Sequence, residues 1–462
     1  MPMRAIWEVI MQFEDTIAAI ATAAGQGGIA ILRISGPKAE SILRQVFRPA
    51  KGGKETYPSH LMVYGQVVKG DEPLDEAMAV LMRAPRSYTR EDVAEIHTHG
   101  GRIMAELALE AVLNEGARQA EPGEFTRRAF LNGRLDLSQA EAVMGLISAG
   151  GRQAAKAAMR QLDGGPSRFI RDALDRLYML MAGLEAAIDY PEEVEEAEAT
   201  QHLQDGVLSL ARQLEAACNE RGVKMLERGM DVVLCGRPNA GKSSLLNALL
   251  GEDKAIVTDV PGTTRDILTG SIELNGLPVR LSDTAGLRDT EDTVEKIGVD
   301  RAQKAIRMAD VVILVIDAGQ MLDGDDKAFL QTPPEGDFAV VLNKSDLQTC
   351  VMADDIKAIC SSVKVIALSA LTGEGLNELK AYLQEKAGEP SRLAITTSRH
   401  LAAARRAVSS LRQAADSLAV HVPLDLAAVD LRDALSALGE ITGDEVEERI
   451  LDQVFSTFCV GK

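Results

Sequence analysis

The residues that could most readily do chemistry form a glycine-rich loop between a short apolar strand and a helix. The strand is expected over Asp231–Cys235, the helix over Ser244–Leu250, and the loop between them (236–243) reads Gly-Arg-Pro-Asn-Ala-Gly-Lys-Ser. In such a loop backbone N–H groups point at phosphate oxygens, and the helix N-terminus adds positive partial charge. Lys242 is expected to reach the β- and γ-phosphates, and the Ser243 hydroxyl to bind Mg²⁺. The spacing predicts a nucleoside triphosphate site.

A second phosphate-side motif follows a predicted strand over Val279–Ser282, which is paired through an Asn275-Gly276 turn. It reads Asp-Thr-Ala-Gly, from Asp283 to Gly286. Asp283 is expected to hold Mg²⁺ through water, and Gly286 to sense the γ-phosphate.

The base is expected to be read by two further segments, Asn343-Lys344-Ser-Asp346 and Ser369-Ala370, each at the end of a predicted strand (338–342 and 365–368). The carboxylate of Asp346 can accept hydrogen bonds from the ring N–H and the exocyclic amine of guanine, a pair that adenine lacks. A backbone N–H after the last strand can reach the guanine carbonyl. The four motifs in this order predict GTP or GDP as the ligand.

The remaining phosphate-side element is a polar, turn-rich loop over Thr258–Asp266, in the position of a switch I segment. Thr264 would give Mg²⁺ its second hydroxyl, and the loop is expected to order around the γ-phosphate and relax after hydrolysis. The full expected nucleotide-binding set is Asn239, Ala240, Gly241, Lys242, Ser243, Ser244, Thr258, Thr263, Thr264, Asp283, Gly286, Asn343, Lys344, Asp346, Ser369 and Ala370.

The group that positions the attacking water is less evident. Leu287 stands where Ras-like enzymes carry a glutamine, and leucine cannot orient water. Either hydrolysis is negligible or another group acts, and Asp292 and Glu295 are the acidic candidates nearby, although from the sequence alone a solvated helix residue is the better interpretation of each. No arginine finger can be assigned. A bound cation could take its place, because catalysis of this reaction is mainly electrostatic.

Three kinds of segment, which differ in composition and hydrophobic periodicity, indicate how these motifs are positioned. Residues 1–132 read as an α+β domain, 133–222 and 390–462 as two parts of one discontinuous all-α domain, and 223–389 as an inserted Ras-like α/β P-loop domain. The multidomain fold suits a length of 462 residues. The expected elements of the first domain are strands over 16–22 and 28–35 and helices over 41–47 and 103–113.

The composition and net charge restrict the kinds of partner and the compartment expected for this chain. A net charge of −19 gives little general affinity for nucleic acid, so such a partner would need a local basic patch, for which a solvated helix face is the plainer interpretation. No stretch is long and apolar enough to span a membrane, and five scattered cysteines suit a cytoplasmic protein without disulfides or zinc. The candidate basic cluster is Arg127, Arg128, Arg134, Arg152, Lys156 and Arg160.

The whole chain after Met11 resembles the MnmE (TrmE) family of bacterial tRNA-modification GTPases. The phosphate-binding loop alone would also fit ribosome-assembly GTPases, but the motifs in the N-terminal and C-terminal parts of the chain resemble those of the MnmE family. The segments that resemble it are GRPNAGKSSLLNAL, TDVPGTTRD, DTAGLRDT and VEKIG in the nucleotide domain, ILRISG (31–36), REDVAEIHTHGG (90–101) and PGEFTRRAFLNGRLDLSQAEA (122–142) before it, and FSTFCVGK (455–462) at the end.

The resemblance implies a homodimer formed through a folate-binding N-terminal domain, and a GTPase stimulated by K⁺. At matching positions Asn239, Thr258, Val260 and Thr263 would bind K⁺, and Glu295 would orient the attacking water, with Lys242 as the other catalytic group. Taken without the family, Asn239 reads as an ordinary turn residue.

For the folate pocket the matching positions are Arg33, Glu95, Arg134 and Lys462, with arginine at 134 where the family usually has lysine. His97 and His99 lie in the same stretch without a third metal ligand. Cys459, which the family shares, reads either as a buried small residue or as a thiolate in the modification chemistry.

The implied reaction adds an aminomethyl or carboxymethylaminomethyl group to carbon 5 of the wobble uridine of certain tRNAs. The one-carbon unit would come from 5-formyl- or 5,10-methylene-tetrahydrofolate. FAD would enter only with a separate partner protein, MnmG, which agrees with the lack of a GxGxxG fingerprint here. The alternatives are a regulatory GTPase of the ribosome-assembly type without group transfer, and an aminomethyltransferase that works without MnmG.

Overall fold

The computed structural model describes residues 14–23, 25, 27–50, 57–190, 196–252, 269–283, 303–420 and 423–462. These residues form two compact units, each assembled from separate stretches of the chain. The first unit contains the described residues up to Met144, Leu162–Leu203 and Val420–Lys462, and the second contains Gly145–Gln161 and Gln204–Ala419. Within the described part of the chain, no helix combines the length and apolar character needed to cross a membrane.

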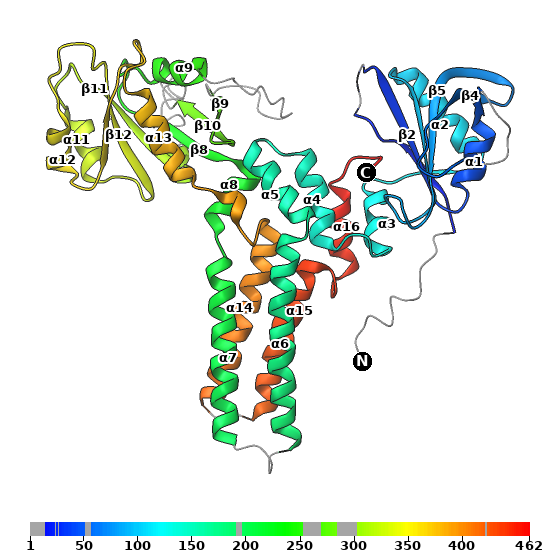
Figure 1. Cartoon of the computed structure of the whole chain (residues 1–462). Coiled ribbons are helices and arrows are strands. Elements are labelled where there is room, and N and C mark those ends of the chain that lie inside the picture. Colours follow the sequence, from blue (N-terminus) through cyan, green and yellow to red (C-terminus); the bar gives the residue numbers. More distant parts are fainter. Residues whose placement is uncertain are drawn as a thin grey trace, which may run out of the picture. The chain divides into compact units, whose positions relative to one another are not determined.

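A seven-stranded sheet is the centre of the first unit (blue to cyan in Figure 1). Its strand order is β3-β4-β5-β6-β2-β1-β7, antiparallel throughout except where β1 pairs with β7. Its strands are β1 (Ile17–Ile20), β2 (Ile29–Ser35), β3 (Phe47–Pro49), β4 (Val63–Lys69), β5 (Glu72–Met82), β6 (Val93–His99) and β7 (Arg118–Gln119). The predicted first two strands are therefore confirmed.

Two helices, α1 (Ala39–Val46) and α2 (Arg102–Asn114), cover one face of this sheet, close to where the sequence predicts them. Side chains alternate across a strand, so Leu32 and Ile34 on β2 enter the core beneath these helices and are fully buried. Arg33 lies between them and points to the opposite face. The pleat thus places a charged side chain on the sheet surface that the two helices leave uncovered.

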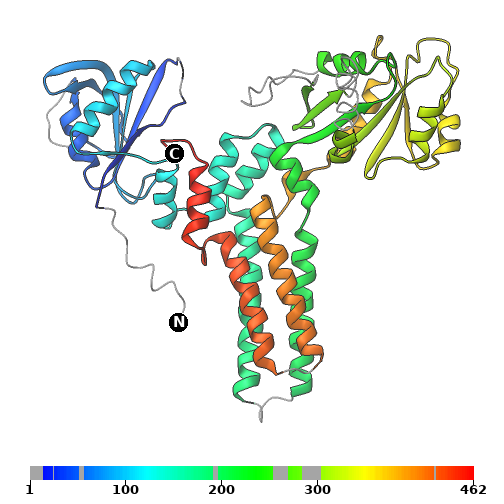
Figure 2. The ribbon, with the colours of Figure 1, turned by 180° about the vertical axis from the view of Figure 1, so that it is seen from behind.

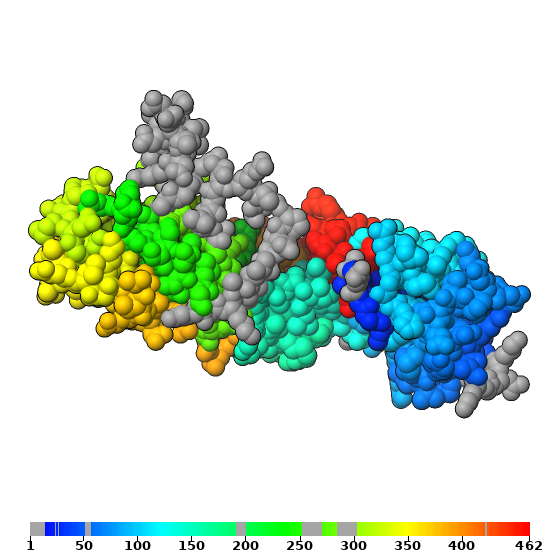
Figure 3. All heavy atoms as spheres, turned by 90° about the horizontal axis from the view of Figure 1, so that it is seen from above, coloured from blue at the N-terminus to red at the C-terminus, as the bar shows by residue number. Residues whose placement is uncertain are grey.

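The rest of the first unit is helical. Helices α6 and α15 lie side by side in both ribbon views (Figures 1 and 2), and α16 packs against α3. The chain's last residues return to the sheet domain: Val460 forms a bridge with Pro122, and Gly461 packs on the Ile20 carbonyl of β1, so the C-terminal segment (red) lies beside the sheet domain (blue to cyan) in Figure 3. The helices are α3 (Glu124–Leu131), α4 (Leu137–Ile147), α6 (Gly165–Asp189), α15 (Leu424–Thr442) and α16 (Glu448–Ser456).

The second unit contains a six-stranded sheet of order β13-β12-β11-β8-β10-β9, parallel except for the antiparallel β9–β10 hairpin. Residues along β11 alternate between two apolar cores, one beneath α9 and α13 and the other beneath α11 and α12. The elements are β8 (Met230–Cys235), α9 (Lys242–Glu252), β9 (Thr269–Leu274), β10 (Leu277–Asp283), β11 (Val311–Asp317), α11 (Gly324–Gln331), β12 (Asp337–Asn343), α12 (Ala353–Ile359), β13 (Lys364–Ala367) and α13 (Leu376–Ala387). This is the predicted doubly wound α/β arrangement.

Among the described residues, the second unit also contains four helices that precede or follow the nucleotide-domain sheet in the chain. They are α5 (Arg152–Leu162), α7 (Glu196–Ala217), α8 (Glu220–Arg228) and α14 (Ser398–Ala419), of which α7 begins and α5 ends in the first unit. Ion pairs join Arg405 of α14 to Glu220 (2.7 Å) and Arg412 to Glu215 (2.6 Å). The helices predicted on both sides of the α/β domain are thus present, while the boundaries of a single discontinuous helical domain stay a prediction.

Candidate functional site

The glycine-rich loop begins where β8, a central strand, ends at Cys235. Gly236 has a φ of 131°, and a Cβ there would collide with the carbonyl of Val315 on the neighbouring strand, so glycine is required. Lys242, only 4% exposed, donates from Nζ to the carbonyl oxygens of Gly236 (2.9 Å) and Arg237 (2.7 Å). The ammonium therefore lies inside the loop that is expected to wrap the phosphates.

Two oxygen-bearing side chains meet at the start of α9. The Ser243 hydroxyl donates to Oδ2 of Asp283 over 2.7 Å, and Asp283 is 1% exposed at the end of β10. Parallel pairing sets Asp283 opposite Leu234 of β8, which fixes the carboxylate beside the loop. A hydroxyl and a carboxylate at this spacing are ligands of the kind that Mg²⁺ prefers, so the residues present fit that ion.

The segment expected to read the base is held by Asn343, which is 2% exposed. Its Nδ2 donates to the carbonyl of Ala240 (2.9 Å), and its Oδ1 accepts from the backbone N–H of Ala370 (3.0 Å). Asn343 thus ties the phosphate loop to the last base-side motif, and its polar atoms serve the protein scaffold. Asp346 is exposed, three residues beyond this bridge.

Sequence reasoning missed Asp317, which ends β11 and pairs with Lys344 (Nζ–Oδ2 2.6 Å). Burial raises the pKa of Asp317, but the hydrogen bonds from Lys344, the Gly319 N–H and Gln320, together with the charge of Lys344, outweigh burial and hold the pKa below its usual value. Lys344 itself has a φ of 65°, a conformation that ordinary residues rarely adopt. The available signal was an acidic residue directly after the apolar run 311–316.

Ser369 shapes the last motif from within. It is fully buried, its N–H donates to the carbonyl of Glu374 (2.9 Å), and its Oγ accepts from the N–H of Thr372 (3.2 Å). The resulting turn presents Ala370 beside Asn343. The structure therefore brings the glycine-rich loop, Asp283, Asn343 and the Ser369-Ala370 turn to one edge of the sheet.

Several predicted residues cannot be placed in this arrangement. Asn239 and Ser244 are both exposed, and Asn239 has a φ of 61° within the loop. The other expected ion-binding, γ-phosphate and catalytic residues lie outside the described part of the chain. They are Thr258, Val260, Thr263, Thr264, Gly286, Asp292 and Glu295.

A second candidate site lies on the uncovered face of the seven-stranded sheet. Arg33 on β2 and Glu95 on β6 are register partners, joined by a hydrogen bond from Nε to Oε1 of 2.9 Å. Burial would raise the pKa of Glu95, but hydrogen bonding to His97 and the charge of Arg33 together hold it below its usual value. Nη1 of Arg33 is buried without a hydrogen-bond partner among the described residues, which leaves a donor available to a ligand.

Tyr88 links this pair to the third predicted residue. Its ring lies 5.1 Å from the Arg33 guanidinium and 4.7 Å from that of Arg134, which also donates to the Tyr88 carbonyl (2.9 Å). The fourth, Lys462, follows Gly461, which packs against β1 beside β2. Arg33 and Arg134 therefore converge on the ring of Tyr88, a residue that sequence reasoning missed, and Glu95 joins them through its hydrogen bond with Arg33.

Two neighbouring predictions need correction or restriction. Cys459 is exposed, so its interpretation as a buried small residue is wrong; its carbonyl accepts from the Gly123 N–H over 3.4 Å. His97 and His99 have different partners. Nδ1 of His99 pairs with Asp75 (2.7 Å), while His97 faces Glu95.

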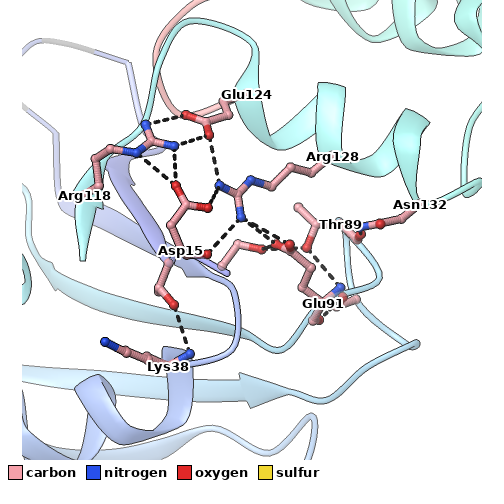
Figure 4. A network of polar contacts seen from close by, with 11 residues as sticks. Asp15, Lys38, Thr89, Glu91, Arg118, Glu124, Arg128 and Asn132 are labelled. Carbon is pink, nitrogen blue, oxygen red and sulfur yellow. Dashed lines mark hydrogen bonds and ion pairs between the residues drawn. The ribbon is translucent and has the colours of Figure 1, made fainter. Parts of the chain in front are cut away.

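The suggested basic cluster is also corrected. Arg128 is 1% exposed and lies within an ion-pair network (Figure 4), bound to Asp15 (2.8 Å), Glu124 (3.0 Å) and Glu91 (3.2 Å). Its charge is neutralised inside the protein and is not available to a polyanion. The neighbouring Arg127 pairs with the acidic side chains of α16, 3.3 Å from Asp452.

A strand, phosphate loop and helix, followed at strand ends by the Asp283, Asn343 and Ser369 segments, define a P-loop guanine-nucleotide-binding protein. The sequence comparisons identify the family more closely. Residues 16–134 match the family model of the GTP-binding protein TrmE N-terminus, and residues 137–459 match that of the MnmE helical domain. The chain belongs to the MnmE family of tRNA modification GTPases.

Curated relatives match over nearly the full length. The tRNA modification GTPase MnmE of Acetivibrio thermocellus is 43% identical, covering 98% of this chain and 100% of the relative. That of Lactiplantibacillus plantarum is 44% identical (97% and 98% covered), and that of Symbiobacterium thermophilum 46% (97% and 100%). Among solved structures, Era of Aquifex aeolicus bound to GDP and AlF4⁻ is 27% identical over 39% of this chain and 66% of that chain, with a TM-score of 0.28, too low to support the fold by itself.

Proposed function

We propose that this chain is a K⁺-stimulated GTPase that acts with MnmG on certain tRNAs. Together they would install an aminomethyl or carboxymethylaminomethyl group on carbon 5 of the wobble uridine, using a tetrahydrofolate one-carbon unit. The observation that carries the nucleotide part is the meeting of Lys242, Ser243 and Asp283 at one sheet edge. The same edge holds Asn343, whose bridge to Ala370 leads to the base-reading segment.

In the proposed site Lys242 would neutralise charge on the β- and γ-phosphates, Ser243 and Thr264 would bind Mg²⁺, and Asp283 would hold the ion through water. The ion would stabilise the charge that develops on the phosphate oxygens. Asp346 selects guanine from its exposed position after β12. Asn239, together with Thr258, Val260 and Thr263, would bind K⁺ in place of an arginine finger, and Glu295 would orient the water.

The folate part of the proposal is supported by the donor set around Tyr88. Glu95 can accept the paired N–H groups of a pterin ring, and the free Nη1 donor of Arg33 lies beside it. Arg134 and Lys462 would hold the anionic glutamyl tail. When bound, the folate would supply the one-carbon unit, while FAD would be supplied by MnmG.

The experiment that tests the GTPase proposal is GTP turnover in KCl against NaCl at matched ionic strength. Wild type, Glu295→Ala and the matched control Asp292→Ala would be compared, with GTP binding measured in parallel. We expect strong K⁺ dependence, and loss of turnover without loss of binding in Glu295→Ala only. Equal rates in both salts would remove Asn239 and its partners as a K⁺ site and would favour a plain regulatory GTPase.

The folate proposal is tested by titration calorimetry with 5-formyl-tetrahydrofolate. Arg33→Met removes the buried donor and the ion pair with Glu95, so binding should weaken strongly. Arg102→Met is the matched control, because Arg102 is exposed on α2 and bonds to Glu106 of its own helix. Equal binding by all three proteins would contradict the pocket.

A further inference from the structure

The β9–β10 hairpin joins the two segments expected to respond to the γ-phosphate. Thr269, the first residue of β9, follows the switch I segment, and β10 ends at Asp283, where the second motif begins. The strands pair continuously from Thr269 opposite Ser282 to Leu274 opposite Leu277. The hairpin is therefore a continuous element with the Mg²⁺-side carboxylate at one end and the Asn275-Gly276 turn at the other.

That turn is fixed to the start of α5. The backbone N–H of Gln153 donates to the Gly276 carbonyl over 2.7 Å, and its side-chain Nε2 donates to the Asn275 carbonyl over 3.0 Å. The backbones pack closely, since a Cβ on Gly151 would lie 2.7 Å from the Gly276 oxygen. A Cβ on Gly276 would likewise lie 2.9 Å from the Cβ of Arg152, so the turn lies directly against the start of the helix.

Gln153 also bonds to the segment through which the chain leaves the nucleotide domain. Its Oε1 accepts from the Ser391 N–H (3.3 Å), and Nε2 lies 3.5 Å from the Gly388 carbonyl. The residue is 5% exposed. The buried side-chain amide of Gln153 on α5 thus bonds to both the hairpin turn and the connection between α13 and α14. It has no role in the proposed nucleotide chemistry.

The far end of α5 has a similar residue with a different partner. Gln161, 3% exposed, accepts from the Thr396 hydroxyl over 2.8 Å. It lies on the same helix as Gln153 but is bonded to the residues before α14. The helix is consequently tied to the nucleotide domain at one end and to the α14 approach at the other.

We propose that Gln153 is a positioning residue that couples the nucleotide state to α5 by anchoring the β9–β10 hairpin. The inference rests on the proposed GTP site, because the displacement to be transmitted begins at Asp283, at the Mg²⁺-side end of the hairpin. A rigid element held at both ends passes a displacement of one end to whatever binds the other. The helix, and not only the switches, then responds to the γ-phosphate.

The test is hydrogen–deuterium exchange of the full chain with Mg²⁺ and either GDP or the non-hydrolysable analogue GMPPNP. Wild type is compared with Gln153→Leu, which keeps the volume but removes the side-chain hydrogen bonds, and with the matched control Gln161→Leu. Gly151→Ala is a second variant, which should displace the turn sterically. In wild type we expect the two nucleotides to change exchange at both the hairpin and α5, by about fivefold or more.

In Gln153→Leu and Gly151→Ala the hairpin should still respond while the α5 response is lost, and in Gln161→Leu both should persist. An α5 response that survives in both of the first two variants would overturn the proposal, as would a wild-type hairpin that responds without α5. If the wild-type hairpin itself does not distinguish the nucleotides, the proposed GTP switch fails instead.

Discussion

At the scale of single residues, Asn343 is a motif residue whose side chain makes its hydrogen bonds to the protein backbone. Its side chain holds the phosphate loop through Ala240 and the base-side turn through Ala370. Both partners are backbone groups, and Gly241 next to the loop carbonyl leaves room for the amide, because a Cβ there would collide with it. The two halves of the nucleotide site are therefore fixed relative to each other by one buried amide.

Asn343→Ala should weaken GDP binding, because it leaves the Ala240 carbonyl and the Ala370 N–H without their partner. An unsatisfied buried group costs about 1–3 kcal/mol, which corresponds to a loss of roughly tenfold or more. Titration of a fluorescent GDP derivative measures the effect. The control is Asn247→Ala, an exposed asparagine on α9; equal affinity of both variants would contradict the bridging role.

At the scale of elements, α3 is held to the sheet domain by charge as well as by apolar contact. Arg128 reaches Asp15 before β1 and Glu91 before β6, while Arg118 on β7 pairs with Asp15 and with Glu124 of α3 (Figure 4). Because the guanidinium of Arg128 is almost fully buried, the positive charge of Arg128 is needed to balance the negative charge of each carboxylate around it.

Arg128→Met should destabilise the first unit by about 3–5 kcal/mol, because removing one partner of a buried network leaves the others uncompensated. Arg127→Met is the matched control on the same helix; its half-exposed ion pairs contribute about 0–1 kcal/mol. Urea unfolding of both variants provides the comparison. If the two substitutions had equal effects, the network would be no more than a surface contact.

The same network predicts a pH dependence. Burial would raise the pKa of Glu124, but the hydrogen bonds from Arg118, the Glu121 N–H and Arg128 hold it below its usual value. A lowered pKa in the folded state means that the stabilisation is present above the unfolded pKa of ~4.3 and is lost as the pH falls through the folded value. The melting temperature of wild type should therefore fall more steeply below about pH 4.3 than that of Glu124→Gln. Parallel curves in calorimetry would count against this.

These elements also show what local sequence can and cannot predict. The strand, loop and helix around Lys242 are contiguous, and their glycines and apolar runs specify them directly, so the prediction agrees with the structure. Arg128 was interpreted as surface charge because its partners Asp15 and Glu91 are distant in sequence. Tyr88 was missed for the same reason: its stacking on Arg33 and Arg134 exists only after the sheet has formed.

At the scale of the whole molecule, the nucleotide domain leaves the helices and returns to them at neighbouring points. Glu227 near the end of α8 accepts hydrogen bonds from the backbone and hydroxyl of Ser398 at the start of α14, both 2.7 Å. Gly222 of α8 lies against Leu393. Neighbouring entry and exit points are what the predicted insertion of the nucleotide domain requires, because they disturb a host domain least.

The proposed homodimer should have about twice the 49.5 kDa mass of the chain by light scattering after gel filtration. The paired residues Tyr64 and Met78 expose 55% and 41% of their surface on the sheet domain, an apolar surface that a second copy could cover. Met78→Lys should reduce the measured mass towards that of one chain. Met308→Lys, a control at a more exposed methionine in the second unit, should not; an unchanged dimer in both would exclude this face.

The contact between the C-terminal segment and the sheet domain has a consequence for biosynthesis. Val460 and Gly461 complete contacts with Pro122 and Ile20, residues that are synthesised several hundred positions earlier in the chain. At about 5–20 residues per second, tens of seconds separate the synthesis of the two partners. During that interval the edge beside β1 is without its final cover. A nascent chain would therefore expose this edge to proteases and to mispairing until its C-terminal segment is made, and a chaperone that shields the edge would protect it over that interval.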